Sequence, residues 1–430
     1  MSTATLPART RTFASLAVRN YRLFFYGGLV SNTGTWMGRV AQTWLVLTIL
    51  TDNSATAVGY LAALQFLPMA LLGPWGGAVA DRFPKRTILV WTQLLLSVNG
   101  LLLAALVLTG TVELWHVYAL ALMLGAISAV DNPTRQAFAS EMVGPALLPN
   151  AVGLNSASFN GARLVGPAVA GVMIALWGVG PAILINSLTF LPVIVALRAM
   201  HTDELMPAPL RRGRGAIREG LRYVAGRPDI QLIMFMVFML GTFGMNFQIT
   251  NALMATEVYH LGADAYGALG SIMAIGSLSA ALMSARRPRP RLSILLGALG
   301  GFAVSTTLLA LAPTYLTFAI MLVPVGLTAL TVMTTANASV QLTTEPAVRG
   351  RVMALYTTIF LGGTPLGSPL IGWIGDAWGA RWTLLIGAVA TGIAFVVGLL
   401  YALRNNNWRF PSWRELRGYP DPAQLDPDEA

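Results

Sequence analysis

The stretch AVGYLAALQFLPMALLGPWGGAVADRFPKR, residues 57–86, begins as an apolar run and ends in one acid and three cations. At about 1.5 Å of rise per residue, the apolar part is long enough to cross a hydrocarbon core of about 30 Å as a helix. Charges are costly inside such a core, so the charged cluster indicates where the chain returns to water. We interpret this stretch as one membrane span followed by a short charged connection.

Similar apolar runs recur along the whole chain. Hydrophobic residues make up 55% of its 430 residues and charged residues only 11%, whereas an ordinary soluble domain has about 25% charged residues. Because only helices and closed barrels satisfy the backbone within lipid, runs this uniformly apolar predict helices. The sequence predicts twelve spans, at 21–50, 57–80, 87–109, 114–136, 149–177, 181–197, 230–258, 265–285, 292–311, 315–336, 352–374 and 382–403.

The distribution of charge predicts the orientation of these spans. The net charge is +10, but in a membrane protein the side on which each cation lies matters more than the sum. If the N-terminus is cytoplasmic, all but three of the 28 Lys and Arg residues lie in or beside cytoplasmic segments. The external turns instead carry the acids Asp52, Glu113, Glu257, Asp264 and Asp376. We therefore expect a multi-pass protein of a bacterial-type cytoplasmic membrane, with both termini cytoplasmic, the lipid bilayer as its surroundings and no nucleic-acid partner.

The longest internal polar stretch divides the chain into two halves. We expect an N-terminal six-helix bundle over 1–200, a cytoplasmic linker over 201–229, a C-terminal six-helix bundle over 230–403 and a cytoplasmic tail over 404–430. Within the linker, AIREGLRYVAG (216–226) is expected to form a short amphipathic helix on the membrane surface.

An internal repeat supports this division. The segment GPAVAGVMIALWG (166–178) aligns with GSPLIGWIGDAWG (367–379) at a shift of 201 residues. The shift corresponds to six spans, and an even number of spans preserves orientation. The predicted fold class is an all-α membrane protein, in which twelve transmembrane helices form two parallel-repeat six-helix bundles around a central route.

Polar side chains inside the predicted spans point to a central cavity. Residues three or four positions apart share one face of a helix, and an Arg in mid-membrane costs about 2.5–3.5 kcal/mol unless it faces water or a partner. Two alternatives remain open: neutral groups that only join helices, and arginines that form internal salt bridges. The candidate cavity residues are Asn32, Thr35, Arg39, Gln42, Asn160, Arg163, Asn246 and Thr250.

The most deeply placed acid is Asp131, near the cytoplasmic end of the fourth span, with Arg135 one helical turn later. This spacing fits an ion pair at a helix end and fits equally a proton or gate switch. No catalytic constellation accompanies it, because the chain has no cysteine and its three histidines have no metal-ligand spacing. The sequence therefore predicts no enzyme and no bound metal or cofactor. We expect an ion gradient to be the source of energy.

The charged connection GAVADRFPKR (77–86) resembles the signature loop of the major facilitator superfamily, in which Gly, three residues, Asp-Arg, one residue and Gly precede basic residues. Pro84 stands here where Gly is usual, and Lys85 where Arg is usual. ARLVGPAVAG (162–171), with Gly166, Pro167 and Gly171, is similar to the helix-five motif of the proton-coupled antiporters of that family. Other stretches are similar to the branch that contains enterobactin-type siderophore exporters and drug:proton antiporters.

The resemblance implies roles for the connection. Gly77 would let the second helix approach the eleventh, and Asp81 would lie at the cytoplasmic start of the eleventh helix, where a carboxylate is favoured by the free N–H groups. Lys85 would link Asp81 to Asp131 as a charge relay. The candidate gate residues are Gly77, Asp81, Arg82, Lys85, Arg86, Asp131 and Arg135.

The leading hypothesis for function is a monomeric secondary transporter that exports small molecules such as drug-like compounds, antibiotics or siderophores in exchange for protons. The first alternative is import of a nutrient or metabolite by the same fold. The second is a non-transporting membrane protein that handles lipids or senses a signal.

Overall fold

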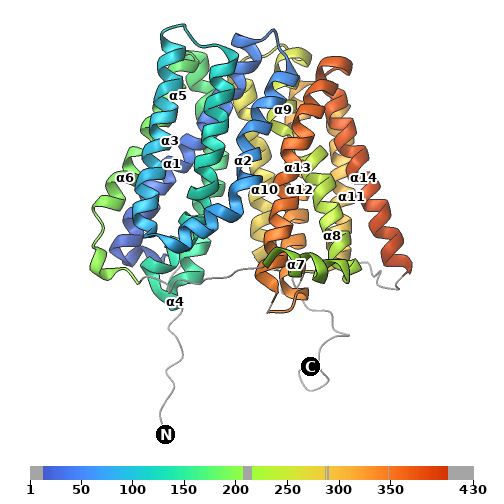
Figure 1. Ribbon diagram of the computed structural model, residues 1–430. Coiled ribbons are helices and arrows are strands. Elements are labelled where there is room, and N and C mark those ends of the chain that lie inside the picture. The colour runs from blue at the N-terminus through green and yellow to red at the C-terminus, as the bar shows by residue number, and fades with distance from the viewer. Residues whose placement is uncertain (1–12, 207–215, 286, 288–289, 347, 405–430) are drawn as a thin grey trace.

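The computed structural model describes residues 13–206, 216–285, 287, 290–346 and 348–404. These residues form helices joined by short turns, and none of them lies in a strand. Figure 1 shows residues 19–198 packed as one group of helices beside a second group formed by residues 228–404. The predicted tail beyond Arg404, and linker residues 207–215, lie outside the described residues.

The first group begins with a 3-10 turn (Ala14–Ala17) and ends in a broken sixth span. Its helices are α1 (Arg19–Trp44), which continues as the π-helix η2 (Leu45–Leu50), α2 (Ala55–Arg82), α3 (Lys85–Leu108), α4 (Leu114–Trp177), α5 (Val179–Leu188) and α6 (Leu191–Arg198). α4 contains both the fourth and the fifth predicted span, because the backbone leaves helical geometry at Gly144, where φ is +66°. That positive φ favours glycine, so Gly144 forms the elbow between the two spans.

The second group begins beside the linker and ends at Arg404. Its elements are α7 (Ala216–Ala225), α8 (Pro228–Met239), η4 (Leu240–Gly244), α9 (Phe247–Leu253), η5 (Met254–Val258), α10 (Ala263–Ala285), α11 (Leu292–Ala310), α12 (Tyr315–Thr343), α13 (Arg349–Trp378) and α14 (Ala380–Arg404). The elements from α8 to η5 form the seventh span, which is interrupted near its middle. A 3-10 turn, Thr202–Glu204, lies at the start of the linker.

The predicted amphipathic helix of the linker is confirmed as α7, which lies across the lower end of the bundle in Figure 1. The guanidinium of Arg227 fixes its junction with α8 by donating two hydrogen bonds to Asp229, of 2.9 and 2.7 Å. These bonds raise the pKa of Arg227 above its usual range. We call the end of the molecule that holds α7 and the α2–α3 turn the linker end, and the opposite end the far end.

Nine of the described helical segments are long and apolar enough to cross a membrane by length and composition. One of them is α4, which contains two spans. The two predicted spans that are absent from the nine are α1 with η2 and α13, the helices that carry Arg39 and Asp376. Including these two gives the twelve predicted spans.

The internal repeat is visible in the backbone. Gly178 ends α4 with φ of +84°, and Gly379, 201 residues later, ends α13 with φ of +94°. A methyl group added at Gly171 would lie 2.6 Å from the carbonyl oxygen of Ala263, at the start of α10, and one added at Gly372 would collide with the carbonyl of Ala55, at the start of α2. Each half therefore presses the equivalent glycine against the first turn of a helix in the other half, which confirms the parallel repeat.

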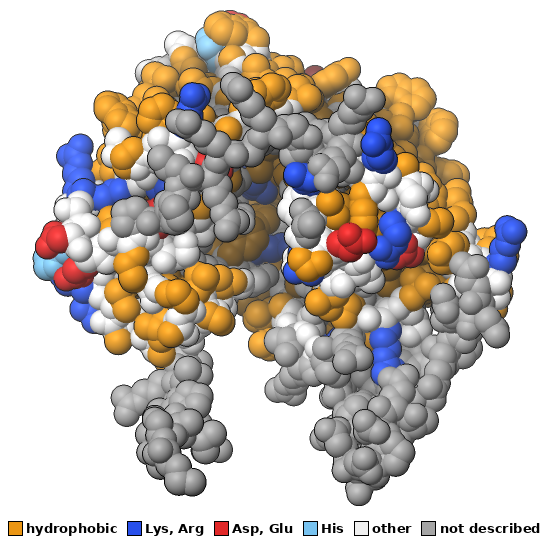
Figure 2. Space-filling model, turned by 60° about the horizontal axis from the view of Figure 1, so that its bottom comes forward, with side chains coloured by type: hydrophobic (Ala, Val, Ile, Leu, Met, Phe, Trp, Pro, Cys, Tyr) orange, Lys and Arg blue, Asp and Glu red, His pale blue; other side chains and the backbone are white. Residues whose placement is uncertain are grey.

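The two halves separate toward the linker end. Gly77 and Gly350, near that end of α2 and α13, and the repeat-related pair Gly161 and Gly362 have no neighbour within 4 Å of an added methyl group. Figure 2 turns this end toward the viewer and shows the molecule hollowed between its halves, with Lys and Arg side chains inside the hollow. The structure is therefore closed at the far end and open at the linker end.

A buried ion pair anchors the start of α3. The ammonium nitrogen of Lys85 lies 2.6 Å from Oε1 of Glu141, and the two side chains are 8% and 7% exposed. The implied link between Lys85 and Asp131 is absent in this conformation, because Asp131 lies about two helical turns farther from the linker end, where Thr92 and Gln93 of α3 bind it. Lys85 is level with Glu141 instead.

We predict that Glu141→Gln lowers the free energy of unfolding by about 3–5 kcal/mol, because it leaves the ammonium of Lys85 buried without a counter-charge. Thermal unfolding of the purified protein in detergent measures this change. Glu204→Gln, which alters an exposed acid paired with His201, is the control and changes stability little. The double variant Lys85→Met/Glu141→Met recovers most of the loss. Equal effects of Glu141→Gln and Glu204→Gln would contradict the prediction.

Candidate functional site

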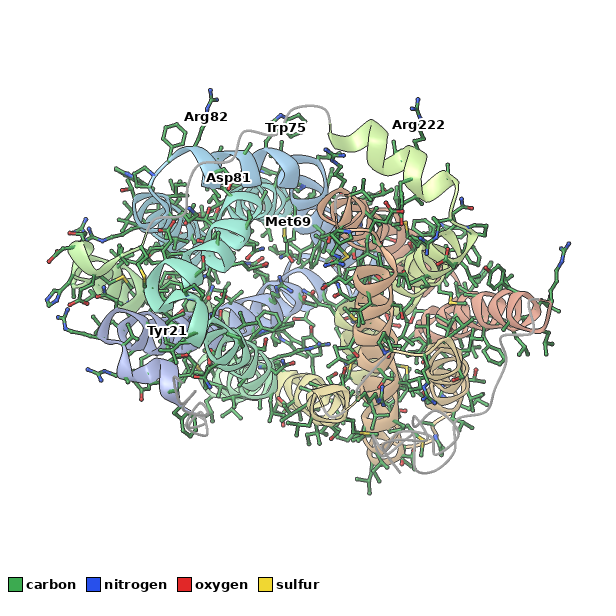
Figure 3. The ribbon with its side chains drawn as sticks, turned by 90° about the horizontal axis from the view of Figure 1, so that it is seen from below. Tyr21, Met69, Trp75, Asp81, Arg82 and Arg222 are labelled. Atoms are coloured by element: carbon green, nitrogen blue, oxygen red, sulfur yellow. The ribbon has the colours of Figure 1, made fainter. Side chains whose placement is uncertain are left out.

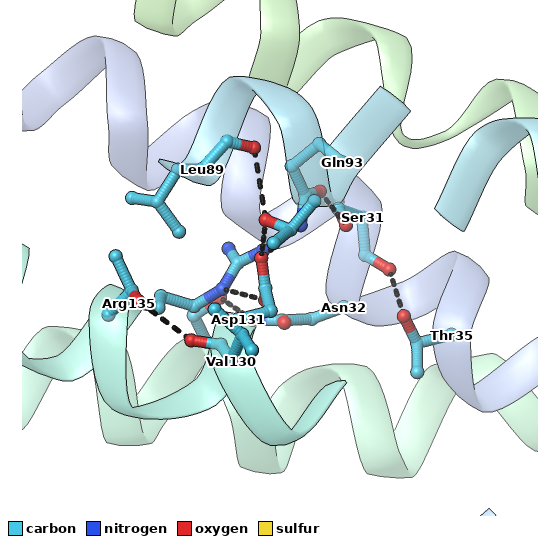
Figure 4. A network of polar contacts seen from close by, with 11 residues as sticks. Ser31, Asn32, Thr35, Leu89, Gln93, Val130, Asp131 and Arg135 are labelled. Carbon is cyan, nitrogen blue, oxygen red and sulfur yellow. Dashed lines mark hydrogen bonds and ion pairs between the residues drawn. The ribbon is translucent and has the colours of Figure 1, made fainter. Parts of the chain in front are cut away.

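A polar network surrounds Asp131 in the first half (Figure 4). Oδ1 of Asp131 accepts hydrogen bonds from Thr92 Oγ1 at 2.6 Å and Gln93 Nε2 at 2.8 Å. Oδ2 lies 3.3 Å from Nε of Arg135, one turn farther along α4. The side chain of Asp131 is only 6% exposed, and three donors are what a buried carboxylate needs. The structure thus confirms that Asp131 and Arg135 form a pair.

The network reaches α1 through Ser31, whose hydroxyl lies 3.5 Å from Oε1 of Gln93. Asn32 on the same helix donates to Ser158 Oγ in α4 at 3.3 Å. Thr35 donates to the carbonyl of Ser31, one turn earlier, and makes no contact with another helix by that bond. The polar face of α1 therefore contacts both α3 and α4 through Ser31 and Asn32.

Two arginines from different spans meet on one indole. Cζ of Arg39 lies 5.0 Å from the ring centroid of Trp36, and Cζ of Arg163 lies 5.5 Å from it. Arg39 is also 5.3 Å from the ring of Phe66 in α2. Within the described residues neither guanidinium has a carboxylate or hydrogen-bond partner, and Nε of Arg39 is buried without one. The alternative that these arginines form internal salt bridges is therefore wrong for this part of the chain.

Three of the candidate cavity residues do not line a cavity in this conformation. Gln42, Asn246 and Thr250 are fully buried, at 6%, 6% and 2% exposed. Each side chain instead accepts a hydrogen bond from a neighbouring helix. These three neutral residues therefore join helices, which was one of the two alternatives. The bonds join Gln42 to Gln65, Asn246 to Ser368 and Thr250 to Thr383. Asn160 is half-buried and donates to Ser156 of its own helix.

The helix-five motif lies where α4 meets other helices. A methyl group added at Gly166 would lie 2.6 Å from Cβ of Trp36, so this glycine lets α1 and α4 touch beside that indole. Pro167 and Gly171 contact Gly267 of α10 in the other half. The small-residue row thus forms close helix contacts, as the sequence indicated.

The gate contacts implied at the linker end are absent in this conformation. Asp81 is exposed and has no hydrogen bond or ion pair among the described residues, and the start of α13 carries no side-chain cap. Gly77 does not touch α13, because the halves are apart at this end. Figure 3 shows Arg82 pointing away from the molecule. Arg86 binds its own half, donating to the carbonyl of Leu197 at the end of α6 at 2.6 Å.

A carboxylate at the far end joins the two halves. Oδ1 of Asp376, in the last turn of α13, accepts from the backbone N–H of Ala55 at 2.6 Å. Oδ2 accepts from the N–H of Thr56 at 3.0 Å and the hydroxyl of Ser54 at 3.1 Å. Free N–H groups and the positive end of the dipole favour an anion at this place. We call this contact the far-end latch.

From the sequence alone, Asp376 is only one of the acids in the external turns. The signal that could have identified it is the repeat, because position 376 aligns with Ala175 and is a place where the two copies differ in charge. The latch is therefore present at only one of the two equivalent contacts between the halves. On the other side, the contacts of α4 with α10 include Gly171, Pro167 and Gly267, together with a bond from the N–H of Ala168 to Ser271 Oγ.

Further contacts close the far half of the interface. Nε2 of Gln248 in α9 donates to Thr43 Oγ1 of α1 at 2.6 Å, and the rings of Trp44 and Tyr266 stack with centroids 6.0 Å apart. Within the described part of the chain, no three His, Asp or Glu side chains come together as a metal site would require. The site consists of a hollow open to the linker end, a polar network around Asp131 and an arginine pair on its N-terminal half.

The chain is similar to known proteins in sequence and in fold. A family model described as a transmembrane secretion effector matches residues 10–422. The chain is 24% identical over 381 residues to the staphyloferrin A transporter of Staphylococcus aureus, covering 86% of this chain and 93% of that protein. It is 26% identical over 382 residues to the multidrug efflux pump Tap of Mycolicibacterium fortuitum, covering 84% and 91%.

The fold is similar to that of a bacterial homologue of the human lysosomal transporter Spinster, solved in an inward-facing and unoccupied conformation. The TM-score is 0.70 with 14% sequence identity, over 91% of this chain and 99% of that one. Together with the family match, which spans nearly the whole sequence, these observations identify the chain as a member of the transmembrane secretion effector family of the major facilitator superfamily.

Proposed function

We propose that this protein exports drug-like compounds, antibiotics or siderophores across a bacterial cytoplasmic membrane by alternating access, in exchange for protons and as a monomer. The observation that supports this most directly is the far-end latch combined with the hollow at the linker end. A chain closed at one end and open at the other is one of the two states that alternating access requires. With the linker end cytoplasmic, as the basic residues indicate, the structure is the inward-open state.

The second state needs a closed linker end, and α2 and α13 provide the parts for it. These helices run antiparallel, so the last turn of each lies at the end where the other begins. Asp376 in the last turn of α13 already caps the first turn of α2. Asp81 in the last turn of α2 is the equivalent acid for the first turn of α13, near Arg349. We propose that rocking of the halves exchanges the first contact for the second.

Proton coupling is assigned to Asp131. It is one of the two buried acids of the described chain, and the other, Glu141, is held by Lys85 at the start of α3. The donors on Asp131 come from α3 and from its own helix. Protonation would remove its charge and weaken the bond to Arg135, which links the proton to the position of that side chain at the edge of the hollow.

The experiment that tests the function uses everted membrane vesicles, whose interior becomes acidic during respiration. Vesicles with the wild-type chain should accumulate at least one compound from a panel of antibiotics and siderophores, and a protonophore should abolish the accumulation. Asp81→Ala should abolish it too, at equal amounts of protein in the membrane, because the linker end cannot close. Asp203→Ala, an exposed acid outside the spans, is the control.

The same vesicles separate the alternatives. Release of a preloaded compound when the interior is acidified would favour import. Absence of gradient-dependent flux across the whole panel would favour a non-transporting protein. Unimpaired export by Asp81→Ala would refute the gate assigned to that residue.

We predict that Asp376→Asn shifts the protein several-fold toward the state open at the far end, because a helix cap of this kind contributes about 0.5–2 kcal/mol. Since the chain has no cysteine, spin labels can be placed at Thr111→Cys and Leu311→Cys, in far-end turns of the two halves. The distance distribution between these labels should gain a longer component. Asp264→Asn, the exposed acid at the start of α10 on the same end, should leave it unchanged; equal distributions for both variants would refute the latch.

We predict that Asp131→Asn retains exchange of substrate across a proteoliposome membrane but loses accumulation driven by a pH gradient. An amide keeps the shape of the side chain and cannot carry the proton. Counterflow without a gradient measures the first activity, and uptake under an imposed gradient measures the second. Loss of both activities would favour a purely structural ion pair with Arg135, and retention of both would exclude Asp131 as the proton carrier.

A further inference from the structure

The N-terminal half contains more inward-facing positive charge than its own acids balance. Its two buried acids each have a cation, since Asp131 pairs with Arg135 and Glu141 pairs with Lys85. Arg39 and Arg163 remain, and within the described residues neither has a carboxylate or a hydrogen-bond acceptor.

The two unpaired charges lie close together. Both guanidiniums lie within 5.5 Å of the centroid of the Trp36 ring, so both contact the same indole. The two positive charges repel each other. The attraction of a cation to an aromatic ring is small beside the cost of holding two like charges within a membrane. The arrangement is therefore short of an anion.

Neighbouring helices and aromatic rings pack around the two arginines. Gly166 lets α4 touch α1 at Cβ of Trp36, which fixes the indole between the two helices. Phe159 packs edge-on against the indole with centroids 5.7 Å apart, and Phe66 lies 5.3 Å from Arg39 on the third side. Nε of Arg39 is buried and has no acceptor. We call the five residues Trp36, Arg39, Phe66, Phe159 and Arg163 the arginine–aromatic box.

We propose that the arginine–aromatic box binds a substrate that carries a carboxylate next to a flat apolar body. A guanidinium presents N–H donors in a planar fork that matches a carboxylate, and Nε of Arg39 is a buried donor without an acceptor. The rings of Trp36, Phe66 and Phe159 would receive the apolar part. This inference rests on the proposed function, because it assumes that the protein transports a substrate, and it places the binding site between α1, α2 and α4 of the N-terminal half.

The test is equilibrium binding of naphthalene-2-carboxylate to the full chain in nanodiscs made only of phosphatidylcholine, with naphthalene-2-carboxamide as the uncharged probe of the same shape. We expect saturable binding of the carboxylate and at least about tenfold weaker binding of the amide, since hydrogen bonds to a charged group are stronger than those to a neutral group. Arg39→Gln and Arg163→Gln should each weaken carboxylate binding about tenfold or more. Arg22→Gln, an exposed arginine on the same helix, should bind like the wild type.

Thermal unfolding separates lost binding from lost folding. Removal of an unpaired buried charge should not destabilise the ligand-free protein, so Arg39→Gln should unfold at or above the wild-type temperature. The carboxylate should raise the unfolding temperature of the wild type and not of the variant. Adding anionic phosphatidylglycerol to the nanodiscs should leave carboxylate binding unchanged; competition by this lipid would assign the box to a lipid headgroup and overturn the proposal.

Equal affinity for the carboxylate and the amide would overturn it as well, and so would unchanged binding by both Arg→Gln variants or no saturable binding to the wild type up to about 1 mM. These outcomes are distinct from failure of the proposed function. Export of uncharged compounds without carboxylate binding would refute the box alone. Carboxylate binding without gradient-driven flux would refute export and retain the box.

Discussion

The arrangement of the two halves depends on a carboxylate at the start of a helix. The first turn of α2 has N–H groups without acceptors in its own helix, and Asp376 of α13 supplies two of them with a charged acceptor. Because α2 and α13 belong to different halves, satisfying this helix end also fixes how the halves meet. The hollow at the linker end, the exposure of Asp81 and the absence of any contact at Gly77 are consistent with that one closure at the far end.

The polar residues of the spans divide into two groups with different physical roles. Gln42, Asn246 and Thr250 are buried and satisfied by neighbouring helices, so they stabilise the bundle. Arg39 and Arg163 are held against aromatic rings with donors left over. The distinction is one of unsatisfied donors rather than of polarity.

Sequence patterns predicted the spans and the repeat well because both depend on local properties. An apolar run of about twenty residues has few alternatives in lipid, and the Trp-Gly pairs at 177–178 and 378–379 mark the same positive-φ break in both halves. Contacts between helices were harder. Spacing alone does not show which turn of α4 Lys85 meets, so Glu141, its partner in this conformation, was not predicted. Asp376 and Ser54 are 322 positions apart, beyond any spacing rule.

The far-end latch exists on only one of the two equivalent seams between the halves. Glycines pack against backbone on both seams, Gly59 and Gly372 between α2 and α13, and Gly171 and Gly267 between α4 and α10. The α2–α13 seam adds hydrogen bonds to a carboxylate, whereas the bond between α4 and α10 is to the hydroxyl of Ser271. The two seams therefore differ in whether a charged side chain joins them. If the α2–α13 seam separates first while the α4–α10 seam stays in contact, the far end opens on the side of α2 and α13. A molecule leaving by that route would meet the lipid beside α2 and α13 before it met water.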